Sequence, residues 1–288
     1  MRTRIILPGR LLSLGLGMAL LCLLSACSFL GLGATQPGNV QSQTPAQVLQ
    51  NAATAMQHLK SAHITMNVGT TANGGSAANQ QPNTLTVRAD GDQVFPGQSS
   101  LHMSIGQMMG GNATKFTEVV TGDQLYVQNA QGQWHVINQK DLTGSPFSAI
   151  QVSNYNSLLM LSQQATITDH GQEMLNGQTT RHITMTFNSS ALKSLLSATG
   201  QLGSLSAQQQ QDLNQQLSQI KLNSSTFDVW VDTTNAYVSR MELKFSISSN
   251  DNETSSVDAT VDYSKYNEQV TITAPAGATP VNNAGDLL

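Results

Sequence analysis

Cysteine is almost absent from this sequence, with only Cys22 and Cys27 among 288 residues. Both lie at the N-terminal end, so the chain beyond them contains no thiol. That part can therefore form neither a disulfide nor a thiolate metal site. A domain without these cross-links depends on its hydrophobic core, and a chain of this length can bury one.

Charge is also scarce, since Asp, Glu, Lys and Arg together make up only 10% of the residues. The chain has 13 basic and 17 acidic residues, and three of the basic ones but none of the acids precede Cys27. The remainder carries 10 basic and 17 acidic residues, a net charge of about −7. Because no basic patch dominates, nucleic acid is not an expected partner.

Catalytic and metal-binding motifs are missing. Neither His-Glu-x-x-His nor Gly-x-Ser-x-Gly occurs, and no spacing gathers metal ligands on one face. His63, His102 and His182 fall on polar faces of predicted strands, so we expect them in solvent. Asp228 and Asp232 would lie about 13 Å apart along a strand, too far for a catalytic pair, and should be solvated. We expect no catalytic residue, no metal site and no cofactor, and hence not an enzyme.

The N-terminus carries an export address. Three arginines and no acid precede "LLSLGLGMALLCLL", residues 11–24, which is typical of a secretion signal and short for a transmembrane helix of about 20 residues. The tetrapeptide Leu-Ser-Ala-Cys that ends at Cys27 resembles the bacterial lipobox. The resemblance implies a signal peptide over residues 1–26 and a diacylglyceryl group on Cys27. A plain signal peptide with a chance cysteine, or a retained signal anchor, is the alternative.

The rest of the chain divides into a tether, one domain and a tail. Residues 27–43 lack a period and are rich in Gly, Gln and Ser, as in a flexible tether. "TPAQ", residues 44–47, is a capping box with proline at the first helical position, and apolar residues follow at helical spacing. The predicted domain runs over residues 44–279, and residues 280–288 form a loose tail.

After Lys60 the apolar period changes to two, which predicts strands. They fall in "HITMNV", "TLTVRA", "LHMSI", "TKFTEVV", "QLYVQN", "QWHVIN", "ATITDHGQEML", "RHITMTF", "RMELKFSIS", "VDATVDY" and "VTITAP". The pair Asn176-Gly177 predicts a hairpin turn. Further helices are expected at residues 154–163 and in two pieces within residues 189–222.

This pattern predicts an α+β fold, in which a large curved antiparallel sheet is covered by a few helices. Few helices over a wide sheet can leave a hydrophobic cavity between them. A fully packed core is the alternative, and the pattern by itself favours it.

Three segments resemble the LolA/LolB-like lipoprotein carriers and the LppX/LprG-type lipoproteins. They are "TPAQVLQNAATAMQHLKSAHITMNV", "FDVWVDTTNAYVSRMEL" and "DYSKYNEQVTITAPAGA", and the likeness spreads over residues 44–279. The proline usual after the turn is replaced at Tyr237–Val238, which affects turn rigidity. The resemblance implies a half-barrel closed by helices around a hydrophobic cavity that binds and carries acyl chains, as lipids, glycolipids or lipoproteins.

Apolar strand residues would then line the cavity. The candidates are Ile64, Met66, Val68, Leu101, Met103, Ile105, Ile183, Met185, Phe187, Met241, Leu243 and Phe245. Methionine suits a cavity that accepts varied chains, and the alternative is that Met66, Met103, Met185 and Met241 simply fill gaps in the core. The expected location is the cell envelope, with membrane attachment through lipidated Cys27. The alternatives are a sensor or regulatory module that binds an envelope protein partner, and a structural surface lipoprotein.

Overall fold

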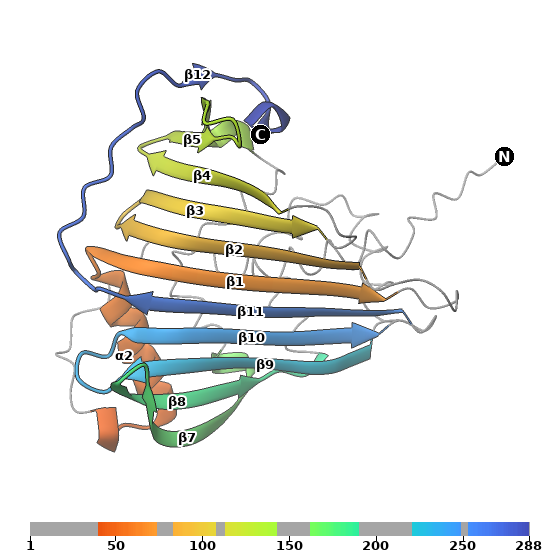
Figure 1. Ribbon diagram of the computed structural model, residues 1–288. Helices are drawn as coiled ribbons and strands as arrows, with labels where there is room; N and C mark the ends of the chain where they lie inside the picture. The colour runs from red at the N-terminus through yellow and green to blue at the C-terminus, as the bar shows by residue number, and fades with distance from the viewer. Residues whose placement is uncertain are drawn as a thin grey trace.

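The computed structural model describes residues 40–73, 83–107, 113–142, 162–189, 221–248 and 253–287. Within these ranges one sheet holds twelve strands (Figure 1). They are β1 (Ser61–Asn73), β2 (Asn83–Val94), β3 (Gln98–Gln107), β4 (Thr114–Thr121), β5 (Gln124–Gln128), β6 (Trp134–Asn138), β7 (Thr166–Leu175), β8 (Gln178–Thr186), β9 (Lys221–Asp232), β10 (Val238–Ser248), β11 (Thr254–Ser264) and β12 (Thr279–Pro280).

The sheet consists of two meanders joined at the middle. Its strand order is β12-β6-β5-β4-β3-β2-β1-β11-β10-β9-β8-β7, so β1 to β6 follow one another on one side and β7 to β11 on the other. The antiparallel pairing of β1 with β11 joins the meanders. Only the short pair of β12 and β6 is parallel among the described strands. The fold is an open, curved α+β half-barrel, as the alternating pattern predicts.

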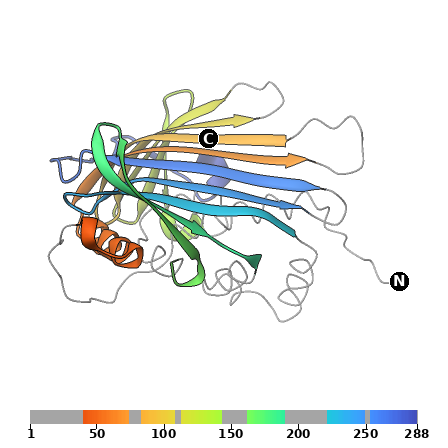
Figure 2. The same ribbon diagram turned by 90° about the horizontal axis from the view of Figure 1, so that it is seen from below.

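Helix α2 (Pro45–Gln57) begins where the sequence predicts. The Thr44 hydroxyl accepts a hydrogen bond from the Gln47 backbone N–H (3.3 Å), and the Gln47 side-chain oxygen accepts one from the Thr44 N–H (2.9 Å). This capping box satisfies two N–H groups that a helix start leaves unpaired. The helix lies against the apolar face of the sheet near β7 and β9 (Figure 2). Its buried residues are Val48, Leu49, Ala52, Ala53 and Met56.

The predicted strands form, with one exception. Asn176 and Gly177 have positive φ angles of 50° and 83° and make the tight β7–β8 turn, as expected for this pair. The segment "VTITAP", residues 270–275, is not a strand. It crosses the ends of the strands (Figure 1), so its backbone does not run alongside a partner with which it could form a ladder.

Both ends of the described domain are packed onto the sheet. Where the sequence predicts the end of a flexible tether, η1 (Val40–Ser42) forms a 3-10 turn and Val40 is buried. Where it predicts a loose tail, residues 279–280 form β12 and η4 (Ala284–Leu287) follows, with Leu287 fully buried. In each case an apolar side chain near the end of the domain, Val40 or Leu287, packs against the hydrophobic core.

Several predicted elements lie outside the described residues. These are the signal peptide, Cys27, most of the tether, most of the helix at residues 154–163, and the two helical pieces within residues 189–222. Among the residues that are described, no helix is both long enough and apolar enough to cross a membrane.

Gly91 marks a point where β2 and β3 approach closely. A Cβ atom at this position would lie 2.1 Å from the Ser100 carbonyl oxygen and 2.9 Å from the Leu101 Cα, both backbone atoms. We expect Gly91→Ala to destabilise the domain by about 1–3 kcal/mol or more, because the two strands would have to separate. Chemical denaturation would measure the loss. In the control Gly106→Ala, the added methyl group would meet the nearest atom at 3.8 Å, an ordinary contact, and an equally large loss there would contradict the explanation.

Candidate functional site

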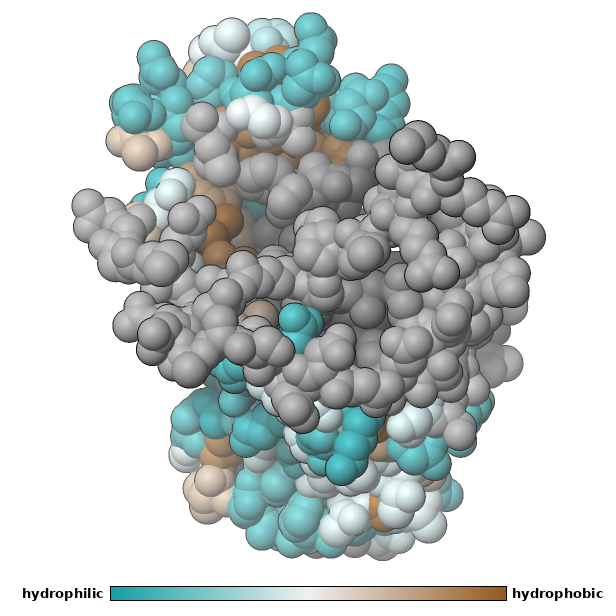
Figure 3. Space-filling view, turned by 90° about the vertical axis from the view of Figure 1, so that its right-hand side faces the viewer, coloured by the Kyte–Doolittle hydropathy of each residue, from teal (hydrophilic) through white to brown (hydrophobic). Residues whose placement is uncertain are grey.

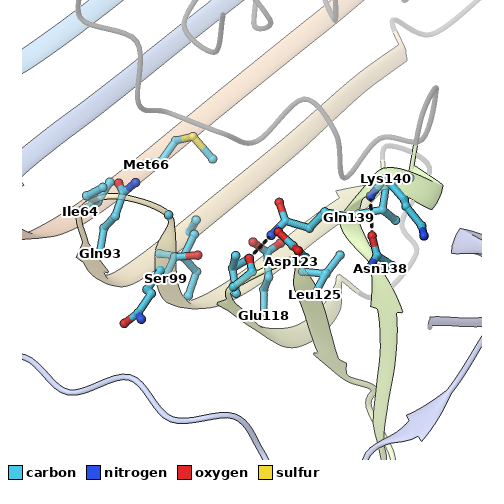
Figure 4. Close-up of a pocket in the computed structure, with 17 residues that line it drawn as sticks. Ile64, Met66, Gln93, Ser99, Glu118, Asp123, Leu125, Asn138, Gln139 and Lys140 are labelled. Atoms are coloured by element: carbon cyan, nitrogen blue, oxygen red, sulfur yellow. Dashed lines mark hydrogen bonds between the residues drawn. The ribbon is translucent and has the colours of Figure 1, made fainter. Parts of the chain in front are cut away.

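A cavity of about 560 Å³ lies on the apolar face of the sheet, between strands β1 to β5 and the 3-10 turn η2 (Gln139–Leu142) (Figure 4). Pockets that hold small molecules usually measure about 300–1,000 Å³. Figure 3 views the molecule from the right-hand side of Figure 1, and hydrophobic residues are visible there between hydrophilic ones. The cavity is large enough for a small ligand, and apolar and polar residues both line it.

The floor of the cavity is apolar because one face of each strand points into it. Strand pairing places Met66 opposite Ala89, and Gly91 between Ile64 and Leu101. The apolar residues that line the cavity are Ile64, Met66, Ala89, Leu101, Val120, Leu125 and Leu142. Residues from five consecutive strands, β1 to β5, and from η2 thus form a single surface on which a hydrocarbon chain could lie.

The rim of the cavity is polar and is built between the β4–β5 turn and η2. The Gln139 backbone N–H donates to the Asp123 carbonyl (2.9 Å), and its side-chain amide donates to the Gly122 carbonyl (2.9 Å). The Lys140 N–H donates to the Asn138 side-chain oxygen (3.1 Å). Figure 4 shows these residues at one end of the cavity. The bonds hold the two turns together, so the rim is a defined edge next to the apolar floor.

Glu118 places a carboxyl group on the apolar floor. It pairs with Leu101 on β3 and Val127 on β5, in the row of side chains that faces the core. Only 6% of its surface is exposed, and Oε2 has no hydrogen-bond partner within the described parts of the chain. Burial raises the pKa of Glu118 to about 7. Near neutral pH this group can thus be a carboxylic acid that donates a hydrogen bond or a carboxylate that accepts one.

The sequence analysis missed Glu118, although the strand carried a weak signal. In β4 the residues Phe116, Glu118 and Val120 alternate with Lys115, Thr117 and Val119. One set contains two apolar residues and the other contains one, so the difference between the two faces is small. The pairing of β4 with β3 decides which set faces inward, and Glu118 belongs to that set.

The twelve residues predicted to line a cavity divide into two groups. Ile64, Met66 and Leu101 line the cavity described above. The other nine lie in the same continuous core, buried except for the half-buried Ile105: Val68, Met103, Ile105, Ile183, Met185, Phe187, Met241, Leu243 and Phe245. Their contact with a ligand stays a prediction. Cys27, the predicted lipidation site, lies outside the described residues.

Several polar side chains expected in solvent are shielded. His63, His182 and Asp228 are half-buried, and Asp232 is buried and accepts hydrogen bonds from backbone N–H groups of the turn that follows it. For these four the expectation is wrong, because neighbours on adjacent strands of a wide sheet cover them. His102 is exposed, as expected.

The expectation that no metal ligands gather on one face is also wrong. His170, His182 and Asp228 each offer a ligand atom, and these atoms all lie within 4.8 Å of one another. The residues belong to three different strands. Their spacing along the chain is therefore set by the strand connections and matches no short motif.

Residues 44–281 match the sequence profile of a family of unknown function, DUF6612. The chain belongs to the DUF6612 family. The matched range includes both the cavity and the three clustered potential ligands. The comparison with curated proteins gives no match.

Solved structures similar to this DUF6612 chain include bacterial lipoproteins. LprF from Mycobacterium bovis is 17% identical with a TM-score of 0.45, and the match covers 84% of this chain and all of LprF. LppX from Mycobacterium tuberculosis is 19% identical with a TM-score of 0.42, and the match covers 80% of this chain and all of LppX. A LolA superfamily protein from Nitrosomonas europaea is 10% identical with a TM-score of 0.25, and the match covers 80% of this chain and 96% of the Nitrosomonas protein. LppX and LolA-like proteins are the ones that the sequence motifs resemble. At these TM-scores the function must be argued from the chain's own geometry.

Proposed function

We propose that this protein is a membrane-anchored lipoprotein of the cell envelope that binds and carries molecules with an acyl chain, such as a lipid, a glycolipid or an acylated protein. The observation that carries the proposal is the cavity, whose apolar floor ends at a polar rim. An acyl chain would lie on the floor, and its removal from water is worth about 0.8 kcal/mol for each buried methylene group. The polar part of the ligand would face the rim.

Glu118 supports a ligand that is amphipathic rather than purely apolar. A buried polar group without a partner costs roughly 1–3 kcal/mol, so a group that satisfies it contributes to binding. A ligand hydroxyl or amide near the carboxyl group would provide a partner for Oε2. Phospholipid ester oxygens only accept hydrogen bonds and would pair with the protonated acid, whereas sugar hydroxyls can pair with either form.

Extraction of bound lipid tests the proposal. The chain that begins at Ser28 retains every described residue but lacks the lipidation site. We expect it to purify with an acyl-containing molecule that organic extraction releases and mass spectrometry detects. Leu101→Trp should fill the cavity and lower the amount of bound lipid severalfold or more. His102→Trp is the matched control, because it places the same side chain on the opposite face of β3.

The outcomes separate the proposal from its alternatives. Ligand-free protein from several hosts would contradict lipid carriage. Cross-linking to a membrane protein in the absence of bound lipid would favour a sensor or regulatory module. Equal lipid loss in both tryptophan variants would place the ligand elsewhere than in this cavity.

Anchoring has a separate test at Cys27. We expect radioactive palmitate to label the full-length protein in its host, and Cys27→Ser to abolish the label because the sulfur accepts the diacylglyceryl group. Cys22→Ser should retain the label, since that residue would leave with the signal peptide. Label that persists in Cys27→Ser would overturn the lipobox interpretation.

A further inference from the structure

Three potential metal ligands meet on the outer face of the sheet, where β7, β8 and β9 form its edge (Figure 1). His170 Nε2 lies 2.8 Å from the Thr184 hydroxyl oxygen, and His182 Nε2 lies 3.0 Å from Asp228 Oδ1. The Thr184 hydroxyl donates to the same Asp228 oxygen. Two imidazole nitrogens and one carboxylate oxygen thus lie within 4.8 Å of one another.

A β-bulge at His170 leaves both His170 and Glu173 on the outer face. Asp169 pairs with Ile183 and Gly171 pairs with His182, so His170 is an extra residue in β7. Gly171 has a φ of 79°, which the bend requires. Asp169 Oδ1 accepts hydrogen bonds from the Gly171 N–H (3.0 Å) and from the Arg181 side chain (3.2 Å). The bulge is therefore held in place, and bulges of this kind redirect side chains.

The His182 ring is also held in a defined orientation. It stacks between His170 and Trp230, with ring centroids 4.4 Å and 4.2 Å away. Its second nitrogen, Nδ1, lies 3.6 Å from Glu173 Oε1, and the Trp230 indole N–H donates to this same oxygen. A carboxylate next to the distant nitrogen of a histidine is the usual support of a metal-binding imidazole. A metal ion bound at Nε2 would displace the proton shared with Asp228, and the Glu173 carboxylate could then accept a hydrogen bond from the proton on Nδ1.

The separations suit a small divalent ion. Zinc bonds to histidine nitrogen and carboxylate oxygen are about 2.0–2.2 Å long, so tetrahedral ligand atoms lie about 3.3 Å apart. His182 Nε2 and Asp228 Oδ1 are already 3.0 Å apart. The remaining ligand atom separations are within 4.8 Å, and the exposed His170 side chain would have to rotate out of its stack on His182 to complete the site.

We propose that His170, His182 and Asp228 form a binding site for a divalent first-row transition metal ion such as Zn²⁺, with Glu173 positioning the His182 ring. Two imidazoles and one carboxylate favour zinc and its neighbours over Ca²⁺ and Mg²⁺, which prefer oxygen ligands alone. Three protein ligands leave one position for water or an external ligand. The site lies on the face of the sheet opposite the cavity, so it is independent of the proposed lipid binding.

Calorimetric titration tests the site. The full-length protein, purified in detergent and freed of metal by EDTA, is titrated with ZnCl₂, and one equivalent is expected to bind. His170→Ala and Asp228→Asn should each weaken binding roughly tenfold or more, and Glu173→Gln about tenfold through the loss of ring support. His102→Ala is the matched control, because it removes a histidine from the outer face of another strand.

The readouts distinguish a metal site from a hydrogen-bonded cluster. Zn²⁺ should raise the unfolding temperature of the natural chain more than that of His170→Ala, while the two proteins unfold at similar temperatures in EDTA because His170 is exposed. No Zn²⁺ binding to the natural chain would overturn the proposal. Binding that His102→Ala weakens as much as His170→Ala would do the same.

Discussion

Replacing Glu118 with glutamine is expected to stabilise the protein at pH 8. The change in the free energy of unfolding that the substitution causes should be about 2–3 kcal/mol more favourable at pH 8 than at pH 5. The carboxyl group titrates near 4.5 in the unfolded chain, and burial raises its pKa to about 7 in the folded protein. Between these values the folded state binds more protons than the unfolded state, so stability falls as pH rises. The contribution of the protonated Glu118 carboxyl group to folding stability is complete below pH 4.5 and is lost as pH rises through 7. Glutamine does not ionise and avoids this loss.

Urea denaturation of both proteins at pH 5 and pH 8 measures the effect. Asp123→Asn is the matched control, because it removes an exposed carboxyl group at the rim of the same cavity. We expect its free energy of unfolding to shift alike at both pH values. If Glu118→Gln also gave the same shift at both, the Glu118 carboxylate would have to be solvated or paired in the folded protein.

Replacing Arg181 with methionine is expected to destabilise the protein by about 2–4 kcal/mol. Its guanidinium donates to the backbone carbonyls of Val40 and Gln43, which lead into α2, and forms a two-pronged pair with Asp169. Only 10% of the Arg181 side chain and 27% of Asp169 are exposed. Loss of the Arg181 guanidinium would leave the partly buried Asp169 carboxylate and the two backbone carbonyls without this donor. Denaturant unfolding at neutral pH measures the cost.

Arg240→Met provides the comparison for Arg181. Arg240 also forms a two-pronged pair, with Asp262 at 2.7 Å and 3.1 Å, but this pair lies on the outer face with 25% and 28% of the side chains exposed. Solvent weakens such pairs, so we expect a loss of about 0–1 kcal/mol. Similar losses for the two arginines would show that the carbonyl contacts and the burial of Arg181 contribute little. In the double variant Arg181→Met with Asp169→Asn, part of the loss should be recovered, because no unpaired charge remains.

The strands were predictable because their signal is local. In β10, Met241, Leu243 and Phe245 alternate with charged residues, and this period of two is a property of consecutive residues. The helix start at Thr44 and the turn at Asn176 are also set by residues within four positions. The segment "VTITAP" has the same alternation but does not form a strand, because the backbone crosses the strand ends there and has no ladder to join.

The candidate site was predictable only in part. The strands that bear Ile64, Met66 and Leu101 were assigned correctly, and these three side chains line the cavity. Glu118 was missed because its strand has nearly equal apolar content on its two faces. The cluster that includes His170 was missed because its three residues lie on three strands, and strand pairing and register, not spacing along the chain, bring them together.

The sequence by itself determined the lack of thiols in the domain, the helix start and the alternating strands, since each depends on residue type or short spacing, and it is the basis for the proposed export signal. The tertiary structure alone decided that β1 pairs with β11, that Glu118 faces the core, and that His170, His182 and Asp228 meet. Strand order and register join residues up to about 200 positions apart in the chain, as between His63 and Ser264. They are set by the burial of the whole apolar face at once, which no local pattern encodes.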